Sequence, residues 1–176
     1  VIDVNDQTRI GNPNPKFTLG WGNTVSIKNF TIDFLFDGRF GGKVMSMGEA
    51  ILDGLGDSKA TEEARDAGGV NINAVNEDGS KFNGPIDAKT FYQGVGGLAG
   101  IGEYYMYDAT NIRLRELSIA YHIPVKAKWV NNLTVSLIGR NLYFVTKKAP
   151  FDPETSMAAN NGLQGIETFS VPSTRS

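Results

Sequence analysis

The sequence has no cysteine and one histidine, His122, among its 176 residues. A chain without cysteine forms no disulfide, no iron–sulfur cluster and no thiolate zinc site. A single histidine does not support a histidine-rich metal site or a Ser–His catalytic pair. We find no activated nucleophile and no paired acid and base, so the sequence predicts neither an enzyme nor a bound cofactor or metal.

Excess charge and long apolar runs are also missing. The chain carries 17 Lys and Arg residues against 19 Asp and Glu, a formal net charge of −2. Nucleic-acid-binding proteins carry a clustered basic surface, so nucleic acid is not an expected partner. No run of about 18 apolar residues predicts a transmembrane helix. The segment Val1–Asp6 lacks a basic start and an apolar run, so no signal peptide is visible, as would also hold for a fragment.

The sequence does contain a regular alternation of apolar and polar residues, in segments of about eleven residues. We predict strands at about 16–27, 30–40, 111–123 and 133–145. Soluble strands usually have about 5–6 residues, whereas a tilted strand needs roughly 9–11 residues to cross a bilayer. The alternation therefore predicts an all-β fold, an antiparallel transmembrane β-barrel segment.

In each predicted strand the apolar residues share one face, because successive side chains point to opposite sides. In a membrane barrel such a row faces lipid and the polar row faces the interior. The residues predicted to face lipid are Phe17, Leu19, Trp21, Val25, Ile27, Phe30, Ile32, Phe34, Phe36, Leu117, Ile119, Tyr121, Leu133, Val135 and Leu137. Asp33, Asp37 and Arg39 lie opposite the phenylalanine row, where we expect them to solvate the inner wall or contact a plug; contact with cargo is the alternative.

The connectors between the predicted strands are alternately short and long. Lys28-Asn29 makes a tight hairpin, and residues 41–110 and 147–172 are long. Outer-membrane barrels have short periplasmic turns and long external loops, so we expect both long connectors to lie outside. Four strands cannot close a barrel, and an open sheet edge is not tolerated in lipid, so the chain is expected to be a fragment of a larger barrel.

Short helices are predicted within the connector 41–110. The first follows an apolar pattern at helical spacing, formed by Val44, Met47, Ile51 and Leu55. The second spans about 59–67, with Ser58 as its N-cap. Residues 69–102 are rich in Gly and Asn, and we expect turns and irregular loop there.

Two groups of side chains near the third predicted strand have alternative interpretations. The strand is preceded by Tyr104, Tyr105 and Tyr107. Three interpretations are open for them: an interfacial aromatic belt, packing within the loop layer, or contact with cargo. We favour loop packing. The tract Asp108–Glu116 carries Arg113 and Arg115 between acidic residues. One interpretation places this tract in a substrate path. The interpretation we favour is an ion-pair and hydrogen-bond ladder at the outer end of the strand.

Specific tracts resemble the late barrel of SusC/RagA-type TonB-dependent outer-membrane transporters. They follow the family's order along essentially the whole chain. The tracts are Gly11–Phe17, Phe34–Gly42, Tyr107–Leu117, Gly139–Leu142, Lys148–Glu154 and Pro172–Ser176.

The resemblance implies that residues 1–176 are the C-terminal part of the barrel domain of a 22-stranded transporter with an N-terminal plug. It implies import of oligosaccharide or peptide cargo across the outer membrane of a Gram-negative bacterium, in contact with outer-membrane lipid. The implied partners are a SusD-like surface lipoprotein and the TonB complex, which engages an N-terminal box. The plug, the TonB box and the final strand are not in this sequence, so we expect this stretch alone to transport nothing.

Two alternatives remain at the level of sequence. One is a soluble, all-β carbohydrate-binding module, in which the same apolar rows form a sandwich core. Its difficulty is the length of the strands and of the connector 41–110. The other is a TonB-dependent receptor of another cargo class, such as siderophores, against which the family-like tracts argue.

Overall fold

A computed structural model describes residues 8–76, 78–98, 100–125, 129–130, 132–154, 164–168 and 174–175. The chain divides into two compact units. The first, here the sheet unit, comprises residues 12–44, 107–156 and 171–176. The second, the helical unit, comprises residues 1–11, 45–106 and 157–170. The predicted connector 41–110 thus builds most of a unit of its own.

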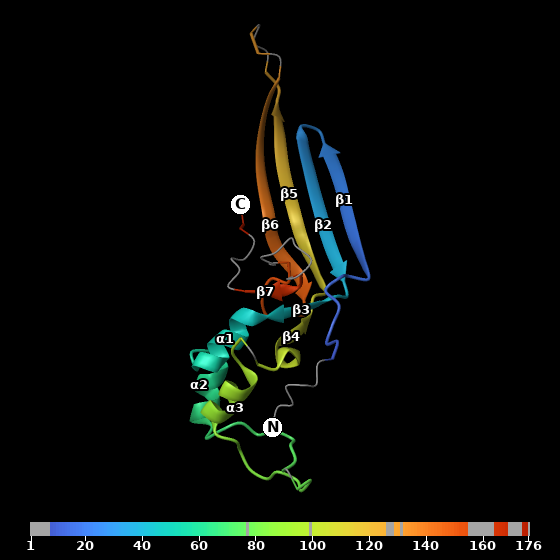
Figure 1. The fold of residues 1–176 in the computed structure, drawn as a ribbon. Coiled ribbons are helices and arrows are strands. Elements are labelled where there is room, and N and C mark those ends of the chain that lie inside the picture. Colours follow the sequence, from blue (N-terminus) through green and yellow to red (C-terminus); the bar gives the residue numbers. More distant parts are fainter. Residues whose placement is uncertain are drawn as a thin grey trace. The chain divides into compact units, whose positions relative to one another are not determined.

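The sheet unit contains one antiparallel sheet of long strands (Figure 1). Its strands are β1 (Phe17–Ile27), β2 (Phe30–Phe40), β5 (Asn111–Ile123) and β6 (Leu133–Lys147), in the spatial order β1-β2-β5-β6. They coincide with the strands predicted from the alternation to within two residues at each end. The predicted antiparallel sheet is therefore confirmed, and within this chain it is open: β1 and β6 form its two edges.

The hairpin between β1 and β2 sets the register of the sheet. Ile27 pairs with Phe30 across Lys28-Asn29, where Lys28 adopts a φ of 52°. From there each apolar residue of β1 meets an apolar or glycine partner on β2, and the rings of Phe17 and Phe40 stack at 4.6 Å. Aromatic cross-strand pairs of this kind contribute about 0.5–1.5 kcal/mol beyond the area they bury.

A bulge in β5 changes the alternation halfway along the strand. Leu35 pairs with Glu116 but Phe36 pairs with Leu114, so Arg115 is the extra residue. A bulge places two residues of one strand opposite one of its neighbour and re-aims side chains. The apolar row therefore continues from Leu117 to Leu114, and Arg113 falls on the polar face. This shift interrupts the alternation of apolar and polar residues along β5, which is regular from Glu116 to Ile123.

The helical unit is built from α1 (Met47–Leu55), α2 (Lys59–Asp66), α3 (Ala88–Val95) and a 3-10 turn, η1 (Gly102–Tyr105). Three short strands are also present: β3 (Lys43–Ser46) and β4 (Met106–Asp108), each divided between the two units along the chain, and β7 (Ile166–Glu167), which pairs in parallel with β3. In Figure 1 the three helices lie close together, in teal to yellow-green. Of the helices described, none has the length and apolarity to cross a membrane.

Polar side chains fix where these helices begin. Ser58 accepts from the backbone N–H of Thr61, which confirms the predicted cap and helix. The first helix was predicted too early, because Val44 lies in β3 and Ser46 caps α1 by accepting from Glu49 N–H at 3.2 Å. The prediction of irregular loop throughout 69–102 was also wrong, because α3 lies within this range and begins after its N-cap residue, Asp87. Its Thr, Phe, Tyr and Gly have modest helix propensity, so packing of its apolar side stabilises it.

Helices α1 and α3 approach each other at glycines. Gly97 N–H donates to the carbonyl of Ala50 at 2.6 Å. A Cβ added to Gly54 would lie 2.8 Å from Gly97 N, closer than side chains pack. By contrast, a Cβ on Gly94, in α3, meets no atom within 4 Å.

These two glycines give a matched prediction. Gly54→Ala forces α1 and α3 apart and is expected to destabilise their packing by about 1–3 kcal/mol. Gly94→Ala replaces an exposed glycine in the last turn of α3 and is expected to stabilise the helix by up to about 0.5–1 kcal/mol. Hydrogen exchange of the peptides that cover 47–55 and 88–95 measures both. Equal protection in the two variants would contradict the close packing.

Candidate functional site

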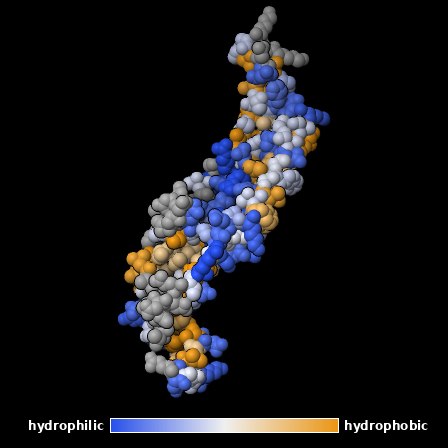
Figure 2. Space-filling model, turned by 45° about the vertical axis from the view of Figure 1, so that its right-hand side comes forward, coloured by the Kyte–Doolittle hydropathy of each residue, from blue (hydrophilic) through white to orange (hydrophobic). Residues whose placement is uncertain are grey.

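The sheet has one apolar and one polar face. All residues predicted to face lipid share the apolar face, because their cross-strand partners are also apolar or glycine, except Asn23 opposite Phe34. Most of them are exposed, among them Leu19 (58%), Val135 (59%) and Leu137 (75%), whereas Ile32, Phe34, Phe36 and Leu117 are half-buried. Figure 2 shows apolar side chains (orange) in patches over the strands, beside hydrophilic ones (blue). Such a surface on a single sheet requires an apolar environment or partner.

The polar face carries hydrogen bonds from strand to strand. Asp33 accepts from Thr24 Oγ1 at 2.6 Å and from Ser118 Oγ at 2.9 Å, which links β1, β2 and β5. Glu116 accepts from Arg140 Nε at 3.1 Å and links β5 to β6. These side-chain hydrogen bonds thus link all four strands across the polar face.

The centre of this face is a set of charged groups that we call the arginine cluster: Asp37, Arg113, Arg115, Asn141, Asp152 and Glu154. Arg113 is 1% exposed, and its Nη2 lies 2.9 Å from Asp152 Oδ1 and 3.0 Å from Glu154 Oε2. Its guanidinium carbon also lies 4.5 Å from the centre of the Phe144 ring. Charge-assisted bonds and a cation–π contact therefore compensate this buried cation.

Arg115 joins the same cluster because the bulge turns it to the polar face. It forms ion pairs with Asp37 and, at 3.0 Å, with Glu154. Asn141 Oδ1 accepts from Arg115 Nη1 at 3.2 Å, and Asn141 itself adopts a φ of 51° where the β5–β6 register shifts. The cluster thereby ties β2, β5, β6 and the segment 152–154 together. The arginines of the predicted ladder do form ion pairs and hydrogen bonds, with Asp37 and the segment 152–154 rather than within their own tract, and the placement of this end of β5 outside the membrane stays a prediction.

A second linkage lies just before β5. Asp108 accepts from Thr110 Oγ1 at 2.6 Å, from Thr110 N–H at 2.9 Å and from Lys148 Nζ at 3.1 Å. Thr110 Oγ1 in turn accepts from Gly41 N–H at 2.9 Å. The Thr110 side-chain hydrogen bond, with further help from its backbone N–H and Lys148, lowers the pKa of Asp108 from 3.8 to about 2.

This shift predicts acid sensitivity. Because the pKa of Asp108 is lower in the fold than its ordinary value of 3.8, its carboxylate stabilises the fold above about pH 4, and this stability is lost as the pH falls towards 2. The urea-unfolding midpoint of Asp108→Asn is expected to fall less between pH 7 and pH 3 than that of the wild type. Asp66→Asn, at the exposed end of α2, serves as the control. Equal pH dependence in wild type and Asp108→Asn would contradict the linkage.

Of the three tyrosines near β5, Tyr104 and Tyr105 belong to the helical unit and Tyr107 to the sheet unit. Tyr105 is 1% exposed and donates to Asp53 Oδ2 at 3.0 Å in the helical unit, where burial raises its pKa. Tyr104 is 49% exposed and packs edge-on against Phe91 and Tyr105. Tyr107 belongs to the sheet unit and packs against Phe151. The surroundings of Tyr105 and Tyr107 fit loop packing, and Tyr104 is the one of the three with a half-open ring.

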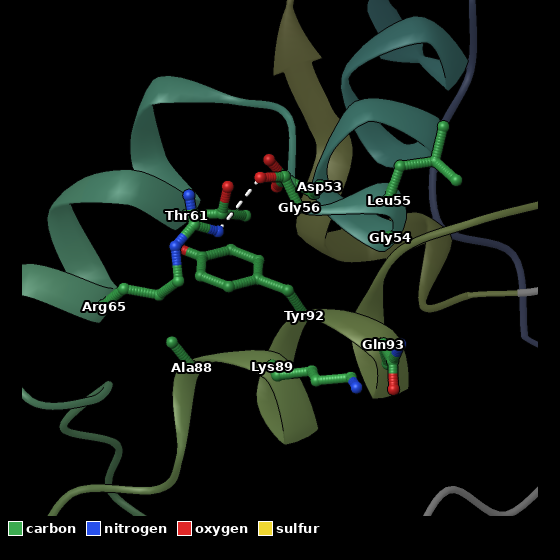
Figure 3. A pocket seen from close by; sticks show the side chains of 10 residues that line it. All are labelled: Asp53, Gly54, Leu55, Gly56, Thr61, Arg65, Ala88, Lys89, Tyr92 and Gln93. Carbon is green, nitrogen blue, oxygen red and sulfur yellow. Dashed lines mark hydrogen bonds between the residues drawn. The ribbon is translucent and has the colours of Figure 1, made fainter.

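The helical unit also contains a pocket of about 300 Å³ between α1, α2 and α3 (Figure 3). Its lining residues are Asp53, Gly54, Leu55, Gly56, Thr61, Arg65, Ala88, Lys89, Tyr92 and Gln93. In Figure 3 Arg65 extends from α2 towards Gly56, and Lys89 and Gln93 extend from α3. Sequence reasoning missed these residues, since they come from three helices and show no motif.

Comparison with known proteins supports the family resemblance. No protein-family model matches the chain. Two curated proteins of Formosa agariphila, TonB-dependent receptor P3 and TonB-dependent receptor P26, are 28% and 26% identical over 99% of this chain. The chain spans 17% of the length of each.

Solved structures give the same result for the fold. The RagAB peptide importer matches 92% of this chain in its open-open state, with a TM-score of 0.60 and 20% identity. Its closed-closed state matches the same share with a TM-score of 0.55 and 19% identity. In both, the matched region is 16% of the importer chain. The resemblance to SusC/RagA-type TonB-dependent transporters is thereby confirmed, and the chain is similar along nearly its whole length to one stretch of these larger proteins.

Proposed function

We propose that this chain is a C-terminal part of the β-barrel wall of a SusC-like TonB-dependent transporter. The complete protein imports nutrient oligomers, glycan or peptide fragments, across the outer membrane of a Gram-negative bacterium. The apolar face contacts lipid and the polar face lines the barrel interior. The observation that carries this proposal is the exposed apolar row, which runs across all four strands of a sheet that matches TonB-dependent receptors.

Strand length supports the membrane assignment. An eleven-residue strand such as β1 reaches roughly 36 Å at about 3.3 Å per residue, enough to cross the hydrocarbon core when tilted by about 40°. In a soluble carbohydrate-binding module the same row would form a buried core, yet Phe17, Trp21 and Leu137 are each more than half exposed. The barrel therefore accounts for the row better than a sandwich does.

The loop assignments follow from the strand directions. The short β1–β2 hairpin lies at the periplasmic side, and the connectors 41–110 and 147–172 lie outside, where the helical unit contributes to an external vestibule. We propose that this region meets a SusD-like lipoprotein, and that the TonB complex engages a part of the transporter outside this sequence. Similarity to a peptide importer and to TonB-dependent receptors supports both partners.

Uptake in cells tests the function. Deletion of the gene for the complete transporter is expected to abolish accumulation of a labelled oligosaccharide or peptide mixture, and dissipation of the proton gradient is expected to do the same in wild-type cells. Crosslinking from Tyr104 and Leu98 in the helical unit is expected to capture a surface lipoprotein. Unchanged accumulation of every labelled oligomer after deletion would contradict import, and accumulation of iron chelates alone would favour the siderophore class.

A further inference from the structure

The pocket of the helical unit presents two cations at its mouth. Arg65 and Lys89 are exposed, and neither forms a salt bridge with any residue that the structure describes. Asp87, two residues before Lys89, accepts through Oδ2 from the N–H and the hydroxyl of Thr90 and forms no salt bridge with Lys89. Two cations on one concave surface without a paired carboxylate favour an anion.

The position of Arg65 is fixed by the end of α1. Its Nη1 donates to the carbonyl of Gly56 at 3.0 Å, the bond drawn as a dashed line in Figure 3. Gly56 has a φ of 83°, and a Cβ there would lie 3.4 Å from Arg65 Nη1, so the left-handed glycine cap also leaves room for the guanidinium. This bond uses one of five N–H donors, and a planar fork that is already oriented loses little freedom when it binds a carboxylate.

The floor of the pocket is closed and mostly apolar. Ala88 and Tyr92 are 3% and 7% exposed, and the Thr61 hydroxyl is used in a bond to Ser58 O at 2.7 Å. Asp53 is 2% exposed; its Oδ2 accepts from Tyr105, and its Oδ1 has no hydrogen-bond partner among the described residues. Two cations and one buried carboxylate leave the lining with a net charge of +1. That balance favours an anion over a neutral or cationic ligand.

We propose that this pocket binds one carboxylate-bearing unit of an oligomeric ligand. The carboxylate binds at Arg65, the attached carbon skeleton packs against the floor at Tyr92, and Lys89 adds a second positive charge to the same lining. A volume of about 300 Å³ is at the small end for ligand pockets and admits a single unit of a chain. The terminal carboxylate of a peptide and the carboxylate of a uronic acid share this chemistry. As a cargo subsite, the assignment rests on the proposed function and names a class of cargo for it.

Binding to the purified complete transporter tests the pocket independently of import. The probes are a tripeptide, the same tripeptide with a C-terminal amide, a glucuronic acid trimer and a neutral glucose trimer, measured by calorimetry at low and high salt. The probes form two pairs, the tripeptide with its amide and the glucuronic acid trimer with the glucose trimer. In at least one pair the probe with the carboxylate is expected to bind at least tenfold more tightly than the probe without it. This preference is expected to weaken with salt. The pair that shows it identifies the source of the carboxylate.

Substitutions locate the binding. Arg65→Gln with Lys89→Gln is expected to reduce the preference for the acid at least tenfold. Lys59→Gln removes an equally exposed cation of α2, paired with Glu63 outside the pocket, and is expected to leave the preference unchanged. All three substituted residues are exposed, so hydrogen exchange in the helical unit is expected to stay as in the wild type except at the end of α1, where Arg65 donates to the Gly56 carbonyl.

Three results would overturn the assignment: equal binding of acid and neutral probes, no binding of any probe at millimolar concentration, or a preference that survives the double substitution. The uptake assay separates this from the larger proposal. If the doubly substituted transporter still imported labelled oligomers and bound the acidic probes as tightly as the wild type, the pocket assignment would be refuted and the transport function would stand. Absence of import in wild-type cells would refute the transport function while the binding measurement stood.

Discussion

Replacement of Phe34 by arginine is expected to cost the assembled barrel about 2–4 kcal/mol, because it places a charge in the hydrocarbon core near its midplane. Phe34 lies in the middle of β2, opposite Asn23 and Leu117, on the apolar face. The complete Phe34→Arg transporter is expected to reach the outer membrane in smaller amounts. It is also expected to lose its heat-resistant, compact mobility in gels at a lower temperature than the wild type.

The neighbouring residue supplies the matched control. Leu35 points to the polar face, where it pairs with Glu116. Leu35→Arg therefore introduces the same charge one residue away, in water and beside a carboxylate, and is expected to change stability by less than about 1 kcal/mol. If Phe34→Arg assembled as well as Leu35→Arg, the assignment of the two faces would be wrong.

The second large effect is expected at the centre of the arginine cluster. Arg113→Met removes a cation that is 1% exposed and leaves Asp152, 8% exposed, without its charge partner. Loss of one member of a buried ion pair costs about 3–5 kcal/mol, because the remaining charge stays desolvated. The urea-unfolding midpoint of the complete transporter in detergent is expected to fall accordingly, and the segment 148–154 to exchange its amide hydrogens faster.

Two further variants separate charge loss from lost packing. Addition of Asp152→Asn to Arg113→Met is expected to recover part of the stability. The uncompensated carboxylate is then gone, while the amide oxygen of the substituted side chain can still accept from Glu154 N–H, as Asp152 Oδ1 does. Arg140→Ala breaks the half-exposed pair with Glu116 and is expected to cost at most about 1 kcal/mol. An Arg113→Met variant no less stable than Arg140→Ala would show that the cluster does not fasten 148–154 to the sheet.

The strands could be predicted from the sequence because their signal is local. A period of two over eleven residues or more fixes strand, facing and length together, and the Lys28-Asn29 turn fixes the first register. The alternation failed at Arg115, where a bulge adds a residue. A bulge depends on the neighbouring strand, so one strand's sequence does not reveal it.

The helical unit was less predictable. Helix α2 could be predicted from Ser58, because an N-cap residue is a local signal in the sequence. Helix α3 has weak propensity and is stabilised by Tyr92 and Val95, whose partners come from distant parts of the unit. The pocket residues could not be found for the same reason: Arg65 and Lys89 share a surface only after three helices pack at glycines.

The central claim, that the sheet is a membrane wall with one lipid face, can be tested on β6 alone. This stretch has no cysteine, so one cysteine at a time can be introduced here at Leu133, Thr134, Val135, Ser136 or Leu137 and spin-labelled, in a complete transporter whose other regions have been freed of accessible cysteine. In lipid vesicles the labels at 133, 135 and 137 are predicted to be accessible to oxygen and shielded from a water-soluble nickel chelate, and those at 134 and 136 to show the opposite. Equal access of the nickel chelate to both rows would contradict the account.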